Sequence, residues 1–253
     1  MSEVVLELSG LRKSFGALVV TDGIELDLRR GECHALIGPN GAGKSTLIHQ
    51  VSGVLKPDAG RIAFEGRDVT HLAQSERAVA GLGRSFQITS ILPEFTVLEN
   101  VALAAQMRAG TSYRFFRPAA GEAALNAKAM EALDVMGLAG RARTVASTLS
   151  HGEKRLLELA IAIAGEPHAL LLDEPMAGMG RAESATLTET LQALKATYPI
   201  LLIEHDMEAV FRLADRVSVL VAGGIVSSGT PDEVRTDPKA RAAYLGDDHV
   251  SAE

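Results

Sequence analysis

The chain has 253 residues, and 47% of them are hydrophobic, which allows a sizeable core in one large domain or a domain with a subdomain. Its formal net charge of −7 argues against a dedicated nucleic-acid-binding protein, because such proteins usually carry a basic domain. The one cysteine, Cys33, excludes a disulfide framework and indicates a reducing compartment. Because the N-terminus does not resemble a signal peptide and no apolar run approaches the roughly 18 residues that span a bilayer, we expect a soluble protein.

The first 70 residues are expected to form mostly strands. Residues 24–28 and 61–66 alternate apolar and polar side chains, which is typical of strands with one buried face. Between them, residues 33–38 form a continuous apolar run, consistent with a strand buried on both faces. A helix is expected directly after this run, over residues 44–55.

The middle of the chain changes character at about residue 90. Residues 96–110 and 121–138 carry apolar side chains at helical spacing, and a basic, aromatic loop at 111–118 separates them. We therefore expect a mostly helical subdomain to be inserted between the strands.

Strand candidates return after residue 165, at 169–175, 199–206 and 216–224, and helical patterns alternate with them. Buried apolar strands that alternate with helices predict a largely parallel α/β sheet.

The segment GPNGAGKST matches the phosphate-binding motif G-x-x-x-x-G-K-[ST] in full, between an expected strand and an expected helix. Its backbone N–H groups can surround phosphate oxygens, and the helix N-terminus favours their negative charge. Lys44 can reach the β- and γ-phosphates, and the hydroxyl of Ser45 can bind Mg²⁺. The alternative is a glycine-rich turn before an ordinary helix. The candidate nucleotide-binding residues are Gly38, Pro39, Asn40, Gly41, Ala42, Gly43, Lys44, Ser45 and Thr46.

Two strand ends carry candidate catalytic groups. The strand ALLLDEP ends in Asp173, at the sheet edge where open α/β proteins bind ligands, which suits a Mg²⁺ ligand. Glu174 then fits a base that polarises the attacking water. The segment ILLIEHD ends in His205, which can donate a hydrogen bond near a γ-phosphate. Acidic strand ends and a structural histidine are the alternatives, and the phosphate-binding motif makes them less favoured.

The stretch LSHGEKR at 149–155 precedes another helical pattern. Ser150 and Glu153 have the spacing of a capping box, which predicts a helix start there. A cap does not require Gly152, so this glycine calls for a second explanation.

Together these motifs resemble one family, the ATP-binding cassette of transporters. Residues 84–87 look like its glutamine loop, and LSHGE looks like its signature, usually L-S-G-G-Q. The order and spacing of five motifs match along nearly the whole chain. The resemblance implies an α/β P-loop NTPase fold with a mixed, largely parallel sheet core, an N-terminal antiparallel β subdomain and an inserted α-helical subdomain. It also implies one cassette over 1–253, with the core and β subdomain in 1–88 and 166–253 and the helical signature subdomain in 89–165.

In this family two cassettes pair head to tail, and each ATP lies between the P-loop of one chain and the signature of the other. The resemblance therefore implies that Ser150 and the backbone N–H of Gly152 face the γ-phosphate bound by the partner chain. Glycine is then needed because backbone must approach phosphate closely. The resemblance also implies that Gln87 contacts the nucleotide and joins Ser45 and Asp173 around Mg²⁺.

Two further side chains have open alternatives. Phe15 matches the position whose aromatic ring stacks on adenine, worth on the order of 1–3 kcal/mol by analogy with base stacking, or it belongs to the core. His151 stands where the signature usually has its first glycine. If that position requires a positive φ, histidine costs on the order of 1 kcal/mol. With an ordinary φ, its ring either reaches the partner chain's phosphate or faces solvent.

Finer features resemble the ATP-binding subunit of importers for branched-chain amino acids, and its relatives for urea and other small polar solutes. They are EPMAGMG at 174–180, the loop at 111–118 and the closing segment at 229–246. The resemblance implies Mg²⁺-dependent ATP hydrolysis, a second ATPase subunit of the same or a different kind, and transmembrane permease subunits. It implies a cytoplasmic location on the inner face of the cell membrane, with membrane contact only through the permease and with no nucleic acid.

Two other functions stay open on the sequence alone. One is a cassette of lipopolysaccharide export, and the other is a soluble cassette without a membrane partner, as in translation or DNA repair. Soluble cassettes usually have two cassettes in one chain or long coiled-coil arms, and this sequence has neither. The solute itself is not encoded here, because specificity lies in the permease and any extracytoplasmic binding protein.

Overall fold

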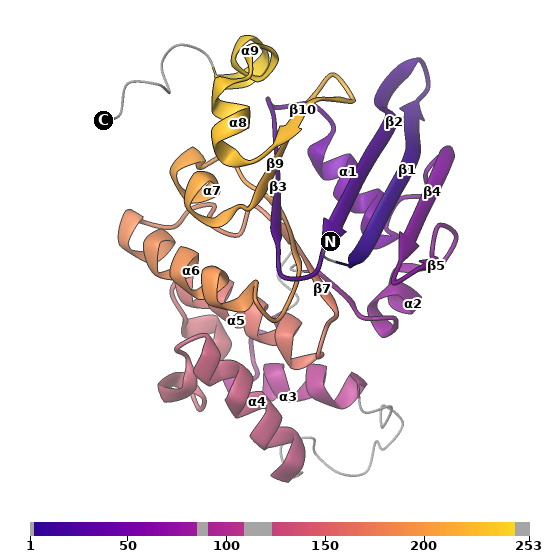
Figure 1. Ribbon diagram of the computed structural model, residues 1–253. Coiled ribbons are helices and arrows are strands. Elements are labelled where there is room, and N and C mark those ends of the chain that lie inside the picture. Colours follow the sequence, from indigo (N-terminus) through magenta and orange to yellow (C-terminus); the bar gives the residue numbers. More distant parts are fainter. Residues whose placement is uncertain (1–2, 85–90, 109–122, 246–253) are drawn as a thin grey trace.

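The computed structural model describes residues 3–84, 91–108 and 123–245. The strands within these ranges form two sheets, and the smaller sheet contains the N-terminal strands (Figure 1). Gln87 and the loop at 111–118 lie outside the described residues.

The smaller sheet has the order β2-β1-β4-β5, and all of its pairs are antiparallel. The strand expected at 24–28 lies within β2, and the one expected at 61–66 overlaps β4. The sequence does not delimit β1 by alternation, because its register with β2 shifts at several points, including between Leu8 and Leu11. The strands are β1 (Val4–Phe15), β2 (Leu18–Arg29), β4 (Ala59–Phe64) and β5 (Arg67–Asp68).

The larger sheet has the order β10-β9-β3-β8-β7-β6, and every pair except β9–β10 is parallel. The four strands expected from apolar runs are its four central strands, which confirms the expected fold class. The edge strand β6 has three residues, too few for periodicity to reveal. The strands are β3 (Cys33–Ile37), β6 (Leu82–Arg84), β7 (Ala169–Asp173), β8 (Ile200–Ile203), β9 (Arg216–Val221) and β10 (Gly224–Gly229).

Helices occupy the connections between these strands, and none of the described ones is long and apolar enough to cross a membrane. The longer helices are α1 (Lys44–Ser52), α3 (Val97–Arg108), α4 (Ala123–Val135), α5 (His151–Ala164) and α6 (Arg181–Leu194). The shorter ones are α2 (Gln74–Val79), α7 (Met207–Leu213), α8 (Pro231–Thr236) and α9 (Pro238–Ala240). Single-turn segments are Ala139–Arg141, Ala146–Thr148 and Arg241–Leu245.

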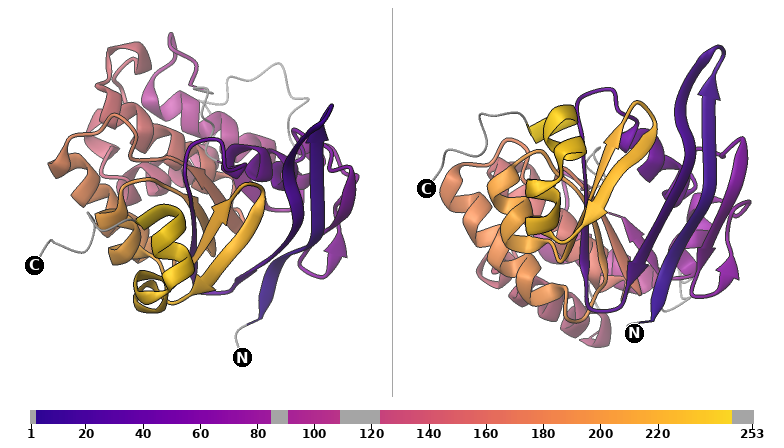
Figure 2. Two further views of the ribbon diagram at one scale, coloured as in Figure 1. Left: turned by 90° about the horizontal axis from the view of Figure 1, so that it is seen from above. Right: turned by 45° about the horizontal axis from the view of Figure 1, so that its top comes forward.

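Helices α3, α4 and α5 pack against one another away from the antiparallel sheet (Figure 1). Helices α3 and α4 fall where the sequence predicts helices at 96–110 and 121–138. At the other end of the chain, α8 packs against β9 and β10, and α9 packs against β10 (Figure 2).

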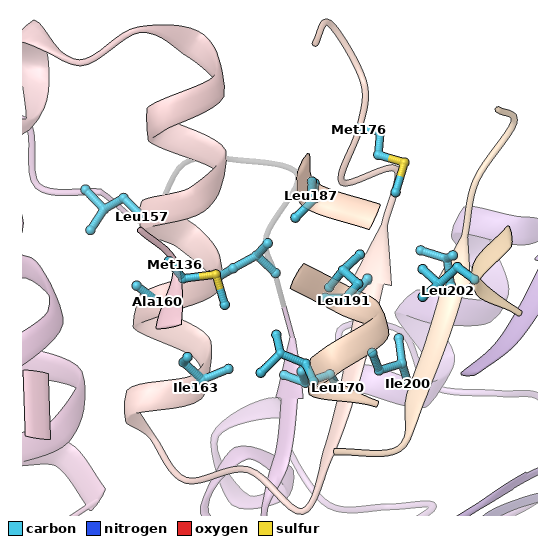
Figure 3. Packing of buried hydrophobic residues seen from close by; sticks show 14 of the residues in the cluster. Met136, Leu157, Ala160, Ile163, Leu170, Met176, Leu187, Leu191, Ile200 and Leu202 are labelled. Carbon is cyan, nitrogen blue, oxygen red and sulfur yellow. The ribbon is translucent and has the colours of Figure 1, made fainter. Parts of the chain in front are cut away.

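The central strands bury side chains on both faces of the larger sheet. On one face, Leu170, Ile200 and Leu202 pack with residues of α5 and α6 (Figure 3). On the opposite face, Leu171 and Leu201 join a cluster formed with α1 and the antiparallel sheet. The two-sided burial explains why these strands are continuous apolar runs rather than alternating ones.

One polar side chain, His34, is buried within the central strand β3. Its Nδ1 donates to the carbonyl oxygen of Asp27 at 2.8 Å, and its Nε2 lies 2.8 Å from the hydroxyl of Ser218, from which it accepts. Burial, helped by the positive charge of Arg216, lowers the pKa of His34 from 6.5 to about 4. His34 is therefore neutral in the folded protein at physiological pH.

The buried histidine predicts a loss of stability on acidification. Between pH 6.5 and pH 4 the unfolded chain binds a proton at His34 that the folded chain does not bind, so stability falls as pH falls. From pH 7 to pH 5 we expect this residue to reduce the free energy of unfolding by about 2 kcal/mol. Urea unfolding at both pH values should show a smaller pH effect for His34→Gln than for the native protein. His71→Gln, which changes an exposed histidine, should keep the native pH effect. An equal pH effect in all three proteins would contradict the prediction.

Candidate nucleotide-binding site

The phosphate-binding loop connects β3 to α1 and is held between β2 and the β9–β10 hairpin. A Cβ on Gly43 would lie 2.4 Å from the carbonyl oxygen of Val20, and its φ is +110°, so only glycine fits without strain. The carbonyl oxygen of Ala42 accepts from the N–H of Gly223 at 3.1 Å. The conformation of the loop therefore depends on its close approach to the backbone of β2 and on a bond from the turn between β9 and β10.

Lys44 is buried and lies folded over the loop. Its Nζ donates to the carbonyl oxygens of Gly38 at 2.6 Å and Pro39 at 3.0 Å. Burial lowers the pKa of Lys44, and the nearby carboxylates of Glu174 and Asp173 partly oppose this shift. The three charged groups that the sequence assigns to nucleotide chemistry therefore lie close enough to influence one another electrostatically.

Asp173 and Glu174 stand at the carboxyl end of β7, where the sequence predicts them. Asp173 is buried, and Glu174 is partly buried. Glu174 has a φ of +48°, an unusual value for a residue other than glycine, of order 1–2 kcal/mol in cost. Its backbone N–H donates to the carbonyl oxygen of Ile203 at 2.8 Å. A hydrogen bond to the neighbouring strand β8 thus holds the backbone of Glu174 in a strained conformation, as is common at functional sites.

The donor groups at this edge fit a magnesium ion. The hydroxyl of Ser45 is exposed at the start of α1, and Asp173 supplies a carboxylate. Mg²⁺ prefers hard oxygen ligands and usually combines one or two carboxylates with phosphate oxygens and waters. The third ligand expected from the sequence, Gln87, lies outside the described residues.

His205 follows β8 by two residues and is largely exposed, with 61% of its side chain accessible. Its Nδ1 lies 3.7 Å from Oε2 of Glu204. Strands β7 and β8 are parallel neighbours, so His205 and Glu174 leave the sheet at the same edge. The exposed ring is free to meet a ligand at that edge.

The predicted capping box at the start of α5 is present. The hydroxyl of Ser150 accepts from the N–H of Glu153 at 3.2 Å, and Glu153 Oε2 accepts from the N–H of Ser150 at 2.9 Å. Helix α5 and the phosphate-binding helix α1 belong to core clusters on opposite faces of the larger sheet. Within one chain, the start of α5 and the phosphate-binding loop therefore belong to helices on opposite faces of the larger sheet.

A contact within the same chain also favours glycine at position 152. A Cβ there would lie 2.5 Å from Oε1 of Glu183, whose Oε2 accepts from the N–H of Gly180 at 3.1 Å. The Glu183 carboxylate ends a flexible side chain and could shift, so this contact favours glycine without strictly requiring it. The sequence did not indicate this contact, because Glu183 lies on α6.

His151 is the first residue of α5 and does not have a positive φ, so the expected backbone penalty does not apply. Its Nε2 lies 3.2 Å from the carbonyl oxygen of Ala177, to which it donates. A Cβ on Gly178 would lie 3.0 Å from the same nitrogen. The imidazole is exposed, as the solvent-facing alternative expected, and it also contacts the loop that follows Glu174 in its own chain.

Phe15 is 52% exposed at the end of β1, so the core alternative is wrong. The Nζ of Lys13 lies 5.7 Å from the centroid of its ring. An exposed aromatic face at this position can stack on a planar ligand.

Glu204 is a site residue that the sequence analysis missed. It is buried, and its carboxylate bonds the backbone on both sides of the site, at Met176 and at His205. The sequence did carry a signal, since Glu204 directly follows the apolar run ILLI and is expected to be buried with that strand end. A buried carboxylate needs hydrogen-bonding partners, so its position predicts contacts with neighbouring groups.

The fold and this edge of the sheet define a class of nucleotide-hydrolysing proteins, and comparison with known proteins agrees. The chain belongs to the ABC transporter family of ATPases, whose family model matches residues 21–177. A second model, described as a branched-chain amino acid ATP-binding cassette transporter, matches residues 225–250.

Particular relatives are similar along the whole chain. LivG, a high-affinity branched-chain amino acid transport ATP-binding protein of Salmonella typhimurium, is 37% identical over 98% of this chain and 100% of its own. The corresponding BraF of Pseudomonas aeruginosa is 34% identical with the same coverage. A sulfate/thiosulfate import ATP-binding protein of Chromobacterium violaceum is 36% identical over 96% of this chain and 63% of its own.

Solved structures agree with the fold. An ATP-binding cassette of an ABC transporter in its ADP conformation has a TM-score of 0.87 and 31% identity, covering 97% of this chain and 100% of that one. A nucleotide-free cassette has a TM-score of 0.85, with the same identity and coverage.

Proposed function

We propose that this ATPase powers the uptake of branched-chain amino acids or a related small polar solute through a separate permease. The observation that carries the solute class is the match of residues 225–250 to the branched-chain amino acid cassette model. Sequence identity over nearly the whole chain does not decide the solute, because a sulfate-import relative is about as similar as LivG. The matched segment includes β10, α8 and α9, which pack together at the edge of the larger sheet.

The charged groups at the sheet edge support assigned roles in hydrolysis. Lys44 exchanges its loop carbonyls for the β- and γ-phosphates, and Ser45 and Asp173 hold Mg²⁺. That ion, when bound, neutralises developing charge on the phosphates. Glu174 accepts the proton of the attacking water, and His205 donates a hydrogen bond that helps to hold that water near the γ-phosphate.

The adenine and the γ-phosphate are proposed to meet two further surfaces. Phe15 stacks on the base, and Ser150 with the N–H of Gly152 binds the γ-phosphate held by a second cassette. This arrangement requires a dimer, with the core in residues 1–88 and 166–253 and the signature subdomain in 89–165. Gln87 is proposed to link these two parts and to contact Mg²⁺.

The permease is proposed to hold the cassettes at the inner face of the membrane. A tagged chain isolated from detergent extracts of its native membranes should bring down a multi-span permease. Proteoliposomes with that complex should accumulate leucine in an ATP-dependent manner. Uptake of sulfate but of neither leucine nor urea would overturn the solute class, and a chain that retains no membrane protein would overturn the importer role.

Gly152→Ala should weaken the ATP-induced dimer about tenfold or more, because the added methyl group keeps the partner's phosphate from the backbone N–H. Within the chain, the methyl group displaces only the flexible end of Glu183, so thermal stability should change little. Sedimentation of the Glu174→Gln protein with and without the second change measures the dimer constant.

Gly140→Ala is the matched control for this measurement. Gly140 lies in the single-turn segment Ala139–Arg141, has open space where a Cβ would sit and lacks a positive φ. It should leave the dimer constant unchanged. A normal dimer constant for Gly152→Ala would show that Gly152 serves only its contact with Glu183.

A further inference from the structure

Glu204 lies between the two loops that carry the proposed base, Glu174, and the proposed hydrogen-bond donor, His205. Its side chain is fully buried, with an exposed fraction of 0%. Oε1 accepts from the N–H of Met176 at 2.8 Å, and Oε2 accepts from the N–H of His205 at 3.0 Å. One carboxylate thus binds the backbone of both loops.

Met176, the residue whose N–H bonds to Glu204, anchors the loop that follows β7. Met176 is buried, and its side chain extends into the core cluster near the ends of β7 and β8 (Figure 3). The hydroxyl of Thr188 lies 4.0 Å from its sulfur. Two residues earlier, the N–H of Glu174 donates to the carbonyl oxygen of Ile203, next to Glu204. The backbones around Glu174 and His205 are therefore joined at two points.

The two N–H groups that Glu204 contacts both need an acceptor, which a carboxylate supplies and an amide of the same shape does not. Burial raises the pKa of Glu204, and the N–H groups of Met176, His205 and Asp206 together with the His205 ring offset only part of this rise. An ionised carboxylate can only accept, so both of its oxygens can face N–H groups. An amide of the same shape would turn its NH₂ group toward one of them.

From this geometry we infer that Glu204 is a positioning residue for ATP hydrolysis, which fixes the loop of Glu174 relative to His205. It holds the two groups in register through their backbones and does not itself touch the nucleotide. The inference rests on the roles proposed above for Glu174 and His205. A buried carboxylate that served stability alone would affect unfolding but not the catalytic step.

The test compares the steady-state kinetics of the whole chain with ATP and Mg²⁺. Glu204→Gln should lower kcat about tenfold or more and leave KM for ATP within about twofold, because a change of about 1.4 kcal/mol at the transition state is tenfold in rate. Hydrogen exchange should become faster at the amides of Met176 and His205. Glu204→Asp keeps the charge but is one carbon shorter, so it should also lose the bond to Met176 and lower kcat.

Glu158→Gln is the matched control, because Glu158 is another buried carboxylate with a pKa raised by burial, paired with Arg155 on α5. It should keep kcat near the native value. An unchanged kcat in either folded Glu204 variant, or an equal loss of kcat in Glu158→Gln, would overturn the inference.

The proposed base is tested separately with Glu174→Gln. Loss of turnover in Glu174→Gln, together with a normal Glu204→Gln enzyme, would leave the proposed chemistry standing and remove only the role of Glu204. Normal turnover in Glu174→Gln would overturn the assignment of the base and, with it, the positioning role.

Discussion

Glu174→Gln should lower the rate of ATP hydrolysis by about 10²–10⁴-fold while leaving ATP affinity intact, because general-base catalysis typically contributes that factor. The strained backbone at φ +48° and the bond from its N–H to Ile203 fix where the side chain begins, so an isosteric amide occupies the same place without accepting a proton. With ATP and Mg²⁺ the variant should accumulate as a stable dimer. Phosphate release and size-exclusion chromatography measure the two effects.

Glu189→Gln is the control for the loss of charge, because Glu189 is exposed on α6. It should hydrolyse ATP at the native rate. Near-native turnover by Glu174→Gln would contradict the base assignment. A protein that stays monomeric with ATP should be tested again with its co-purified partners, since the second cassette can be a different chain.

Lys44→Ala should weaken ATP binding by about tenfold or more. A lost hydrogen bond to a charged group costs roughly 1.5–3 kcal/mol. The ammonium group donates to the carbonyl oxygens of Gly38 and Pro39, and we expect ATP binding to exchange these bonds for phosphate contacts. Titration calorimetry with ATP measures the affinity.

Lys56→Ala removes an exposed lysine of the same charge and should bind ATP normally. Because Lys44→Ala also leaves two loop carbonyls without their donor, its thermal unfolding should be recorded beside the calorimetry. An unchanged affinity in a folded Lys44→Ala protein would contradict the phosphate role.

The sequence alone predicts the features of this protein that local chemistry controls. The phosphate-binding motif, the strand ending in Asp173 and the capping box of Ser150 each depend on neighbours within a few residues. The central strands were also predictable, because burial on both faces demands continuous apolar runs. The edge strand β6 and the bulged strand β1 were not delimited, because short length and register shifts remove the periodic signal.

The tertiary structure decided which distant residues meet around the site. Gly152 faces Glu183, 31 residues further along, His151 contacts Ala177, and Glu204 binds the N–H of Met176. Each contact forms because helices packed on one face of the sheet and adjacent parallel strand ends bring separate loops together at one edge. Periodicity and motif spacing report which side chains a local segment buries. They do not report which other segment lies opposite, because that depends on the order of the strands in the sheet and on the packing of helices across it.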